Sequence, residues 1–531
     1  MEIFTIILYS DQLQYKVQAV CISSNPILLH LSPKTSFILL FLRYLSNSLL
    51  NIVLDNSLLL DGEPPLEQGW IPYLGLALEF TRDPQAFLLS CQQKNGDIFT
   101  VYLAGKYVTF ILDPFLYQFV IQKNKQLDFQ EFAMDLSSKV FGHPHLNDPK
   151  IPVSNEQLHK LYNYLQGKEL NNLIESVMRN LNHRLNLEQL KSTEWKTDKL
   201  LDFCYRTMIE VSFASLYGTS PCDEQKQISE LMQKFRKFDK MFPYLVAKIP
   251  IKLLWNTKRI REDLINYFIS RELDGRLNMA FVIEKRKEFL EQHKYLQDHD
   301  IAAHHFALFW AAVGNTVPAT FWAMYYLMKH PEAFTAVRDE IDHVLQSKDQ
   351  GLAPVFNIRL SKEDLDSLIN LGSAINETFR FCSASMNIRV SQEDFTLKFQ
   401  EDRRIQLRKG DCVAIYPPLV HMDPEIYNHP EVYKFDRFME NGKEKTTFYK
   451  GDKKLRYYLM PFGSGSSMCP GRYFAINEIK IFITLILGIF DIEIVKEEKL
   501  IKQDINRAGL GILHPNSEVC FRYRLRQGRK I

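Results

Sequence analysis

Apolar residues recur every three or four positions through the middle of the chain, from about residue 155 to about residue 350. This spacing predicts amphipathic helices that pack one face against a common core. Residues 301–330 are apolar on nearly every side, which predicts a helix that is buried all round. Asp300 is expected to cap this helix and Pro331 to end it. Unbroken, the helix would be about 45 Å long at about 1.5 Å per residue, long enough to cross the molecule.

A different pattern occurs before this helical region. Residues 98–102 and 107–112 alternate between apolar and polar positions around Gly105, which predicts a β-hairpin. Further elements are expected as strands at 396–399 and 412–415, an apolar helix at about 470–489, and a closing hairpin at 512–524. The whole pattern predicts a mainly α fold with a small β part in one large domain.

The N-terminal segment follows neither pattern. A membrane-spanning helix needs about 20 consecutive apolar residues, but the run at 37–42 stops at Arg43, and the run at 49–60 contains polar residues. Residues 1–61 are therefore expected to form a weak membrane-anchoring or interfacial segment. A stretch rich in glycine and proline follows, so the folded domain is expected to span residues 62–531.

Composition narrows the classes of function. The chain of 531 residues has a net charge of +2 and is 46% hydrophobic, so it has ample material for a core and lacks the basic excess of nucleic-acid-binding proteins. Its eight cysteines are scattered, and none forms a Cys-x-x-Cys pair, which argues against zinc ribbons and redox pairs. All except Cys469 are expected to be free thiols in a reducing compartment.

Cys469 lies in a glycine-rich turn immediately before an apolar helix, in the stretch PFGSGSSMCPGRYFA at 461–475. Such a turn lets backbone N–H groups approach the sulfur closely, and the helix directs its positive N-terminal end at the same point. Both effects favour the thiolate, which is the form of cysteine that binds a metal. The alternative is a structural cysteine buried in a tight turn.

The spacing of Phe462, Gly465, Cys469 and Gly471, F-x-x-G-x-x-x-C-x-G, resembles the haem-binding signature of the cytochrome P-450 superfamily. The resemblance implies the mainly α haem-thiolate fold of that superfamily, with haem b as cofactor and Cys469 as the axial ligand of the iron. It also implies that Phe462, Gly465 and Gly471 shape the haem-binding turn.

Two other segments agree with this resemblance. Glu377 and Arg380 lie three residues apart and would share one face of a helix. Arg437 follows in the stretch KFDRF. In the superfamily, a helix and an arginine segment of this kind form a buried charge network that supports the haem fold. The resemblance therefore implies that Glu377, Arg380 and Arg437 stabilise the structure and do not contact substrate.

A further matching segment is AAVGNTVPATFW at 311–322. Pro318 has no N–H group and cannot bond to the carbonyl of Gly314, which opens a gap in the helix beside Asn315 and Thr316. Such a gap can hold oxygen, water or a substrate hydroxyl; the alternative is a simple proline kink. In the superfamily the matching threonine helps to deliver protons, so Thr316 and Asn315 are the expected catalytic residues.

The chain also departs from the superfamily pattern. Asn315 stands where an acid is usual, Ser467 stands where a basic residue usually reaches a haem propionate, and residues 158–168 lack the usual tryptophan. The propionate partners are therefore open. Candidates by location alone are His159, Lys160 and Lys168, and a solvated helix surface is the alternative interpretation of each.

These departures, with the stretch SASMNIR at 383–389, resemble the sterol 7α-hydroxylase branch of the superfamily. The resemblance implies 7α-hydroxylation of oxysterols such as 25- or 27-hydroxycholesterol, and of related 3β-hydroxysteroids, in cholesterol and bile acid metabolism. It implies oxygen and electrons from NADPH, with NADPH–cytochrome P-450 reductase as partner. It places the protein on the endoplasmic reticulum membrane, with the catalytic domain facing the cytosol and no nucleic acid as partner.

The same resemblance suggests which residues meet the sterol and the reductase. The residues expected to line a long apolar sterol pocket are Trp310, Asn315, Ser383 and Ser385. The basic residues expected to dock an acidic reductase are Lys453, Lys454 and Arg456, for which a plain solvated loop is the alternative.

Three other functions are open from the sequence. The chain could be a cholesterol 7α-hydroxylase, a haem-thiolate isomerase that resembles prostacyclin synthase, or a catalytically silent oxysterol-binding protein. Thr316 argues against the isomerase, whose chemistry needs no proton delivery, and Asn315 in place of an acid keeps the silent protein in consideration. Dependence on NADPH, and product formation with the reductase, would separate these functions.

Overall fold

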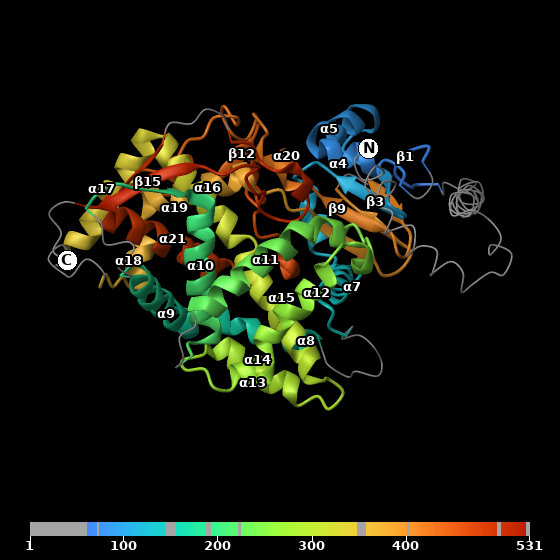
Figure 1. Ribbon diagram of the computed structural model, residues 1–531. Coiled ribbons are helices and arrows are strands. Elements are labelled where there is room, and N and C mark those ends of the chain that lie inside the picture. Colours follow the sequence, from blue (N-terminus) through green and yellow to red (C-terminus); the bar gives the residue numbers. More distant parts are fainter. Residues whose placement is uncertain are drawn as a thin grey trace, which may run out of the picture.

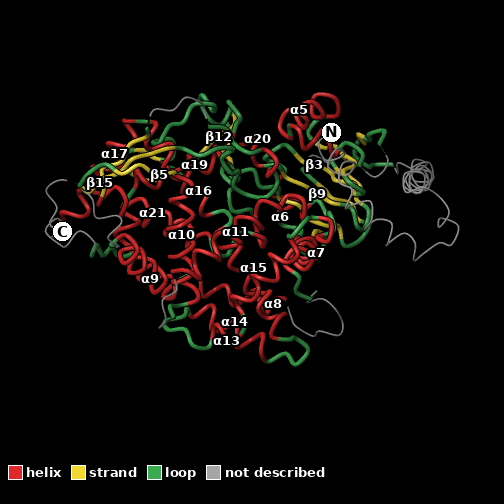
Figure 2. The backbone as a smooth tube through the Cα atoms, viewed as in Figure 1, coloured by secondary structure: helices red, strands yellow, loops and turns green. Residues whose placement is uncertain are grey.

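The computed structural model describes residues 61–71, 74–144, 155–186, 193–220, 225–347, 357–400, 403–495 and 501–526. The anchoring segment expected at 1–61 lies outside this part except for its last residue. Within the described ranges, no helix is both long and apolar enough to cross a membrane. Helices make up most of the molecule and short strands form a few small sheets (Figure 1, Figure 2), so the predicted mainly α class is confirmed.

The helical body is built around α21 (Arg472–Ile489), which is the apolar helix predicted near the C-terminus and is buried over nearly its whole length. It packs against α9 (Gly167–Leu185), α16 (Thr316–Lys329) and α17 (Pro331–Ser347). Helix α10 (Leu200–Tyr217) packs against both α9 and α16. Because so many helices hold α21, its N-terminus, three residues after Cys469, has a fixed place in the core.

The long helix predicted at 301–330 is in fact two helices, α15 (Asp298–Val313) and α16, which are separated at Gly314 and Asn315. The cause lies in Pro318, whose nitrogen carries no hydrogen and cannot bond to the Gly314 carbonyl. Most side chains of α16 are buried, as predicted, but only half of those of α15 are, so α15 is not buried on every side. The break itself lies inside the protein, where its free backbone groups need polar partners.

The start of α15 also differs from the prediction. Gln297 is the N-cap residue, and Asp300 is the third residue of the helix. The Asp300 carboxylate accepts a hydrogen bond from the Gln297 N–H at 3.0 Å, and its charge complements the positive end of the helix dipole. An acid in this region therefore signals the helix start, but not which residue is the cap.

The largest sheet lies at one side of the helical body, next to α4 (Ala77–Arg82) and α5 (Pro84–Asn95) in Figure 1. Its strand order is β1–β2–β3–β9–β6–β4. Its strands are β1 (Leu66–Glu67), β2 (Ile98–Leu103), β3 (Lys106–Ile111), β4 (Leu127–Asp128), β6 (Asn387–Ser391) and β9 (Cys412–Ile415). The predicted hairpin is confirmed: β2 and β3 pair antiparallel, and Ala104 and Gly105 turn with positive φ. The strands predicted at 412–415 and 396–399 are confirmed as β9 and β7 (Phe395–Lys398).

The predicted closing hairpin at 512–524 is wrong. Only its second half is a strand, β15 (Cys520–Leu525), which pairs with β14 (Phe490–Ile494) and with β5 (Lys196–Lys199). The alternating pattern correctly indicated the strand β15. Its partner is not the residues just before it but β14, which directly follows α21 in the chain. Residues 509–512 instead form a loop that reaches the break between α15 and α16.

Candidate active site

Cys469 lies between a short turn, η6 (Gly465–Ser467), and α21. The Cys469 N–H donates to the Phe462 carbonyl at 2.8 Å, which closes the loop. Gly465 has a φ of +63°, and a Cβ there would lie 2.5 Å from Ile121 Cγ2, so the position admits only glycine. These constraints hold the sulfur at the start of α21.

The sulfur of Cys469 accepts hydrogen bonds from the backbone N–H groups of Gly471 and Arg472, at the N-terminus of α21. Burial raises the pKa of the Cys469 thiol above its ordinary value, while these N–H groups and the Arg472 charge act in the opposite direction. Iron binding replaces the thiol proton, and N–H groups stabilise the resulting thiolate. The donor set around Cys469 therefore fits a thiolate that would bind haem iron.

A buried arginine lies against the cysteine loop. Arg389 of β6 is 1% exposed, and its Nη2 donates to the Ser464 carbonyl at 3.2 Å and to the Ser467 hydroxyl at 3.0 Å. Its Nη1 has no hydrogen-bond partner in the part of the chain that the structure describes. Burial lowers the pKa of the guanidinium, which still stays charged. A buried cation with a spare N–H group fits an anion such as a haem propionate.

Sequence reasoning missed Arg389, although it ends the SASMNIR stretch. It meets Ser467 across 78 residues of chain, and only the course of β6 past the loop brings the two together. The sequence did hold one indication that another cation binds here: position 467 is a serine and not the usual basic residue. A serine leaves room for a cation from a distant part of the chain. The candidates chosen by location lie at exposed positions of α8 (Asn155–Lys160) and α9, namely His159, Lys160 and Lys168.

Glu377 and Arg380 lie on one face of α19 (Ile369–Cys382), and both side chains are fully buried. Arg380 donates to the two Glu377 carboxylate oxygens at 2.8 and 2.9 Å, and Arg437 Nε donates to the same carboxylate at 2.9 Å. Arg380 also donates to backbone carbonyls in the segment 421–438. Breaking a buried pair costs about 3–5 kcal/mol, so this network ties α19 firmly to that segment.

Polar contacts hold the break between α15 and α16. The Thr316 hydroxyl, whose residue is 5% exposed, donates to the Ala312 carbonyl at 2.7 Å. The Gly314 carbonyl, left without a helical partner, lies 3.4 Å from His514 Nε2. Burial lowers the pKa of His514 to about 4, so the ring is neutral and can donate from this nitrogen. His514 therefore takes the place of the N–H that the proline lacks.

The loop at 509–512 gathers most of the predicted substrate contacts. Asn315 Oδ1 accepts a hydrogen bond from the Ile512 N–H at 2.9 Å, across 197 residues of chain. Ser383 and Ser385 form isolated β-bridges with the same loop. Neither serine hydroxyl has a hydrogen-bond partner among the described residues. Asn315, Ser383 and Ser385 thus contact one loop beside the helix break, with hydroxyls available to a ligand.

Trp310, the other predicted substrate contact, belongs to a buried network. Its indole N–H donates to Asp239 Oδ1 at 2.9 Å. Asp239 is 2% exposed, pairs with Arg507 at 3.2 Å, and lies 3.8 Å from His514 Nε2. Sequence reasoning missed this network, because its members come from α11 (Gln225–Val246), α15 and the C-terminal segment, which no local pattern connects.

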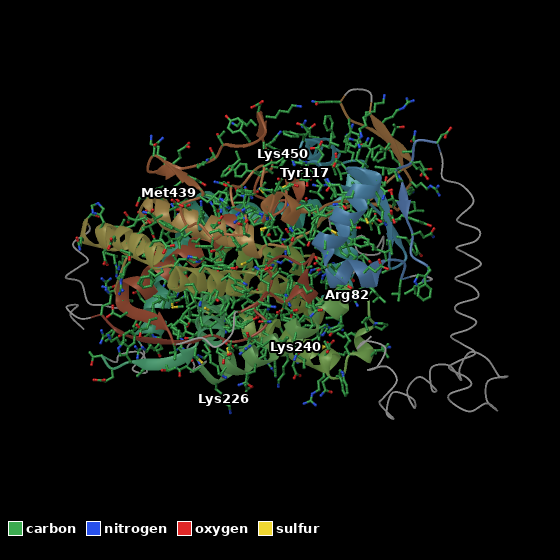
Figure 3. The ribbon with its side chains drawn as sticks, turned by 90° about the horizontal axis from the view of Figure 1, so that it is seen from above. Arg82, Tyr117, Lys226, Lys240, Met439 and Lys450 are labelled. Carbon is green, nitrogen blue, oxygen red and sulfur yellow. The ribbon has the colours of Figure 1, made fainter. Side chains whose placement is uncertain are left out.

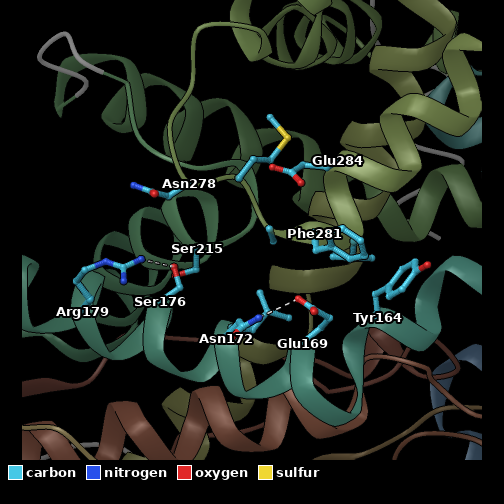
Figure 4. Close-up of a pocket in the computed structure, with 13 residues that line it drawn as sticks. Tyr164, Glu169, Asn172, Ser176, Arg179, Ser215, Asn278, Phe281 and Glu284 are labelled. Atoms are coloured by element: carbon cyan, nitrogen blue, oxygen red, sulfur yellow. Dashed lines mark hydrogen bonds between the residues drawn. The ribbon is translucent and has the colours of Figure 1, made fainter.

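Two of the pockets among the described helices lie beside α9 and α15. The smaller, of about 230 Å³, lies beside α15 and has Trp310 in its wall. The larger, of about 330 Å³, lies between α9, the end of α10 and the segment leading into α14 (Phe281–Glu291), and Figure 4 shows its polar lining. In that lining Arg179 donates to Ser176. No residue predicted for the site lines the larger pocket, so the smaller one is the better candidate for a sterol.

Comparison with known proteins gives the class of protein that this fold and site define. A family model described as Cytochrome P450 matches residues 64–521. The chain therefore belongs to the cytochrome P450 family, whose members are haem-thiolate proteins, and it is a monooxygenase of that family. The expected superfamily is confirmed.

Individual relatives agree with the expected branch. The chain is 46% identical to Cytochrome P450 7B1 of Mus musculus over 469 residues, which are 88% of this chain and 92% of the relative. It is 43% identical to 25-hydroxycholesterol 7-alpha-hydroxylase of Rattus norvegicus, with 78% of this chain and 99% of the relative covered. It is 41% identical to Cholesterol 7-alpha-monooxygenase of Cricetulus griseus, with 88% and 94% covered. The predicted likeness to sterol 7α-hydroxylases is confirmed.

Proposed function

We propose that the protein 7α-hydroxylates oxysterols such as 25- or 27-hydroxycholesterol, and related 3β-hydroxysteroids. The observation that carries the proposal is the loop at 509–512, which brings Asn315, Ser383 and Ser385 to the helix break beside Thr316. The similarity to a 25-hydroxycholesterol 7-alpha-hydroxylase supports the choice of substrate. The pocket of about 230 Å³ has apolar walls that reach along α15 as far as Ala311, four residues before Asn315. An apolar pocket with a few polar groups near it suits a ligand that is mostly hydrocarbon with few hydroxyls.

In this proposal Cys469 binds the haem iron and Arg389 binds a propionate. Haem b, when bound, supplies the oxygen-activating chemistry, with electrons from NADPH delivered by NADPH–cytochrome P-450 reductase. Thr316 holds a proton at Oγ1, and rotation of its hydroxyl away from the Ala312 carbonyl would let it pass that proton on. His514 keeps the Gly314 carbonyl in place, so the break retains its shape while Thr316 moves.

The polar residues of the site orient one end of the sterol. The hydroxyls of Ser383 and Ser385 can each donate and accept a hydrogen bond, and so can the amide of Asn315. The Asn315 oxygen already accepts from the loop backbone, which fixes the side chain. An uncharged amide beside an apolar sterol also avoids the cost of burying a carboxylate there. Trp310 contributes its ring to the pocket wall while Asp239 holds its N–H.

A basic surface supports docking of the reductase. Lys453, Lys454 and Arg456 are exposed in and after the strand β13 (Lys453–Leu455). This strand pairs with β12 (Phe448–Lys450), which carries the labelled Lys450 in Figure 3. The basic residues of this hairpin outnumber its one acid, Asp452, and an excess of positive charge attracts an acidic partner and speeds association.

An exposed apolar surface supports a membrane location. Between α11 and α12 (Thr257–Ile265), Trp255 is 77% exposed and Leu253 is 48% exposed, with lysines nearby at 248, 252 and 258. Apolar side chains flanked by lysines suit the interfacial region of an anionic bilayer. This surface would hold the catalytic domain on the cytosolic face of the endoplasmic reticulum membrane, alongside the segment 1–61.

Cholesterol 7α-hydroxylation is the second candidate, because the chain is also similar to a cholesterol 7-alpha-monooxygenase. The test gives purified protein, reductase and NADPH either 25-hydroxycholesterol or cholesterol, and identifies products by mass spectrometry. We expect a 7α-hydroxylated product that requires NADPH and forms preferentially from 25-hydroxycholesterol. Turnover without NADPH would indicate an isomerase, and binding without product would indicate a silent binding protein; either result would contradict the proposal.

A further inference from the structure

The pocket of about 230 Å³ beside α15 joins apolar walls to a small polar cluster. The apolar side comes from α7 (Phe129–Phe141), α8 and α15, and includes Met134, Phe141, Leu158, Leu308 and Trp310. The polar side is formed by Ser137, His143, Tyr162, Arg286 and His304. A hydrocarbon body with one polar end matches this division of the walls.

In the polar cluster, Arg286 Nε and His304 Nε2 are both buried without a hydrogen-bond partner among the described residues. His304 is the neutral one of the two. It is 2% exposed, and its Nε2 has no hydrogen-bond partner within the described ranges. The His143 ring stacks on it, with 4.0 Å between centroids and 20° between planes. The His143 nitrogens are engaged by the Ser137 hydroxyl at 2.8 Å and the Pro144 carbonyl at 2.9 Å. The stack therefore positions the His304 ring without satisfying Nε2.

The imidazole of His304 is neutral, so its free nitrogen suits a hydroxyl partner. Burial lowers the pKa of His304 well below its ordinary value, and His143 and Arg286 act in the same direction. Arg286 is 3% exposed and donates to the Tyr162 hydroxyl at 3.1 Å and to the His304 carbonyl at 3.4 Å, which fixes this turn of α15. A neutral imidazole nitrogen donates or accepts according to its tautomer, so it can pair with a hydroxyl in either sense.

The position of His304 along α15 matches the length of a sterol. His304, Leu308 and Ala311 share one helix face, and all line the pocket. Eight residues separate His304 from Ala312, the partner of the Thr316 hydroxyl, which corresponds to about 12 Å at about 1.5 Å per residue. This span is comparable to the separation between ring B of a sterol and the end of its side chain. If C7 lies at the break, a sterol that extends along α15 would bring its side-chain terminus close to His304.

We propose that His304 Nε2 binds the hydroxyl at the end of an oxysterol side chain, and that this bond makes the enzyme prefer oxysterols to cholesterol. The inference rests on the proposed function, because it places C7 beside Thr316. Asn315, Ser383 and Ser385 then hold the opposite, 3β-hydroxyl end. A flat, rigid sterol held at both ends presents one edge to the reaction centre.

The test measures the dissociation constants of 25-hydroxycholesterol and cholesterol by spectral titration of the haem-loaded protein. His304→Phe keeps a ring of similar size and removes the nitrogen, so the preference for 25-hydroxycholesterol should fall on the order of tenfold to a hundredfold. Affinity for cholesterol should change little. His304→Gln, which can still donate and accept, should retain part of the preference.

His305→Phe is the matched control. His305 is also fully buried, and neither of its ring nitrogens has a partner among the described residues, yet it is not part of the pocket wall. The preference should therefore be unchanged in this variant. Loss of the preference in both variants would indicate a general effect of histidine removal and would overturn the assignment.

An unchanged preference in His304→Phe would also overturn it, and so would a parent protein that binds both sterols equally. In either case 7α-hydroxylation of 25-hydroxycholesterol by the parent would leave the proposed function intact. If His304→Phe does not take up haem, the assignment is tested on the unmodified protein with sterols that carry a hydroxyl at different carbons. A hydroxyl at C25 should tighten binding relative to cholesterol, whereas a hydroxyl at C20, close to ring D, should not. Equal gains from both hydroxyls would refute the role of His304.

Discussion

Asp239 connects three elements beside the pocket, and its removal should destabilise the protein measurably. Its carboxylate accepts from the Trp310 indole at 2.9 Å and pairs with Arg507 at 3.2 Å. Asp239 and Arg507 are 2% and 4% exposed, so solvent does little to screen either charge. Asp239→Asn keeps the shape of the side chain and removes the charge that neutralises Arg507.

The expected loss follows from the burial of this pair. Breaking a buried ion pair by removing one partner costs about 3–5 kcal/mol. With an unfolding entropy of about 2.1 cal/mol/K per residue, a chain of 531 residues unfolds with about 1.1 kcal/mol/K. The midpoint temperature of Asp239→Asn should therefore fall by about 3–5 °C. Circular dichroism on haem-loaded protein, at one pH and without sterol, measures this shift.

A double variant tests whether charge is the cause. Asp239→Asn together with Arg507→Met removes both charges, keeps an amide oxygen that can accept from the Trp310 N–H, and leaves no buried charge without a partner. The double variant should recover most of the lost midpoint temperature. The reasoning would be refuted by an Asp239→Asn midpoint within about 1 °C of the parent, or by a double variant less stable than the single one.

The other predictions concern the iron ligand, proton delivery, substrate orientation and the membrane. Cys469→Ser should lose the red-shifted Soret band of the reduced carbon monoxide complex, because a neutral hydroxyl donates far less charge than a thiolate; a retained band would assign the ligand to another residue. Thr316→Ala should keep its haem but divert electrons from NADPH to peroxide, and normal coupling of NADPH use to product would remove Thr316 from the mechanism. Asn315→Leu loses the acceptor for the Ile512 N–H, a loss worth about 1–3 kcal/mol. The variant should bind 25-hydroxycholesterol more weakly, and product mapping should show hydroxylation at positions other than C7α. Unchanged affinity with only 7α product would exclude a role of Asn315 in orienting the substrate. Removal of residues 1–35 should leave the protein attached to membranes in a flotation assay, because residues 36–60 hold more apolar content, and full release would contradict this.

Local features were readable from the chain itself. The Cys469 turn, the pairing of Glu377 with Arg380 three residues later, and the hairpin around Gly105 all depend on residues close in sequence, where backbone geometry is nearly set by residue type. The missing N–H of Pro318 likewise predicted a gap beside Thr316. The same local pattern wrongly predicted one continuous helix across Gly314. The apolar periodicity continues through the break, and the polar groups that bond to the break come from distant parts of the chain.

Those partners were decided by the tertiary structure alone. Arg389 meets Ser467 across 78 residues, Asn315 meets Ile512 across 197, and Asp239 meets Arg507 across 268. No periodicity encodes such contacts, because they depend on which buried polar group the packing of distant helices and strands brings within hydrogen-bond reach. An unpaired polar atom is costly when it is buried. Each of these groups therefore bonds to a polar group from a distant part of the chain that the fold places within hydrogen-bond distance.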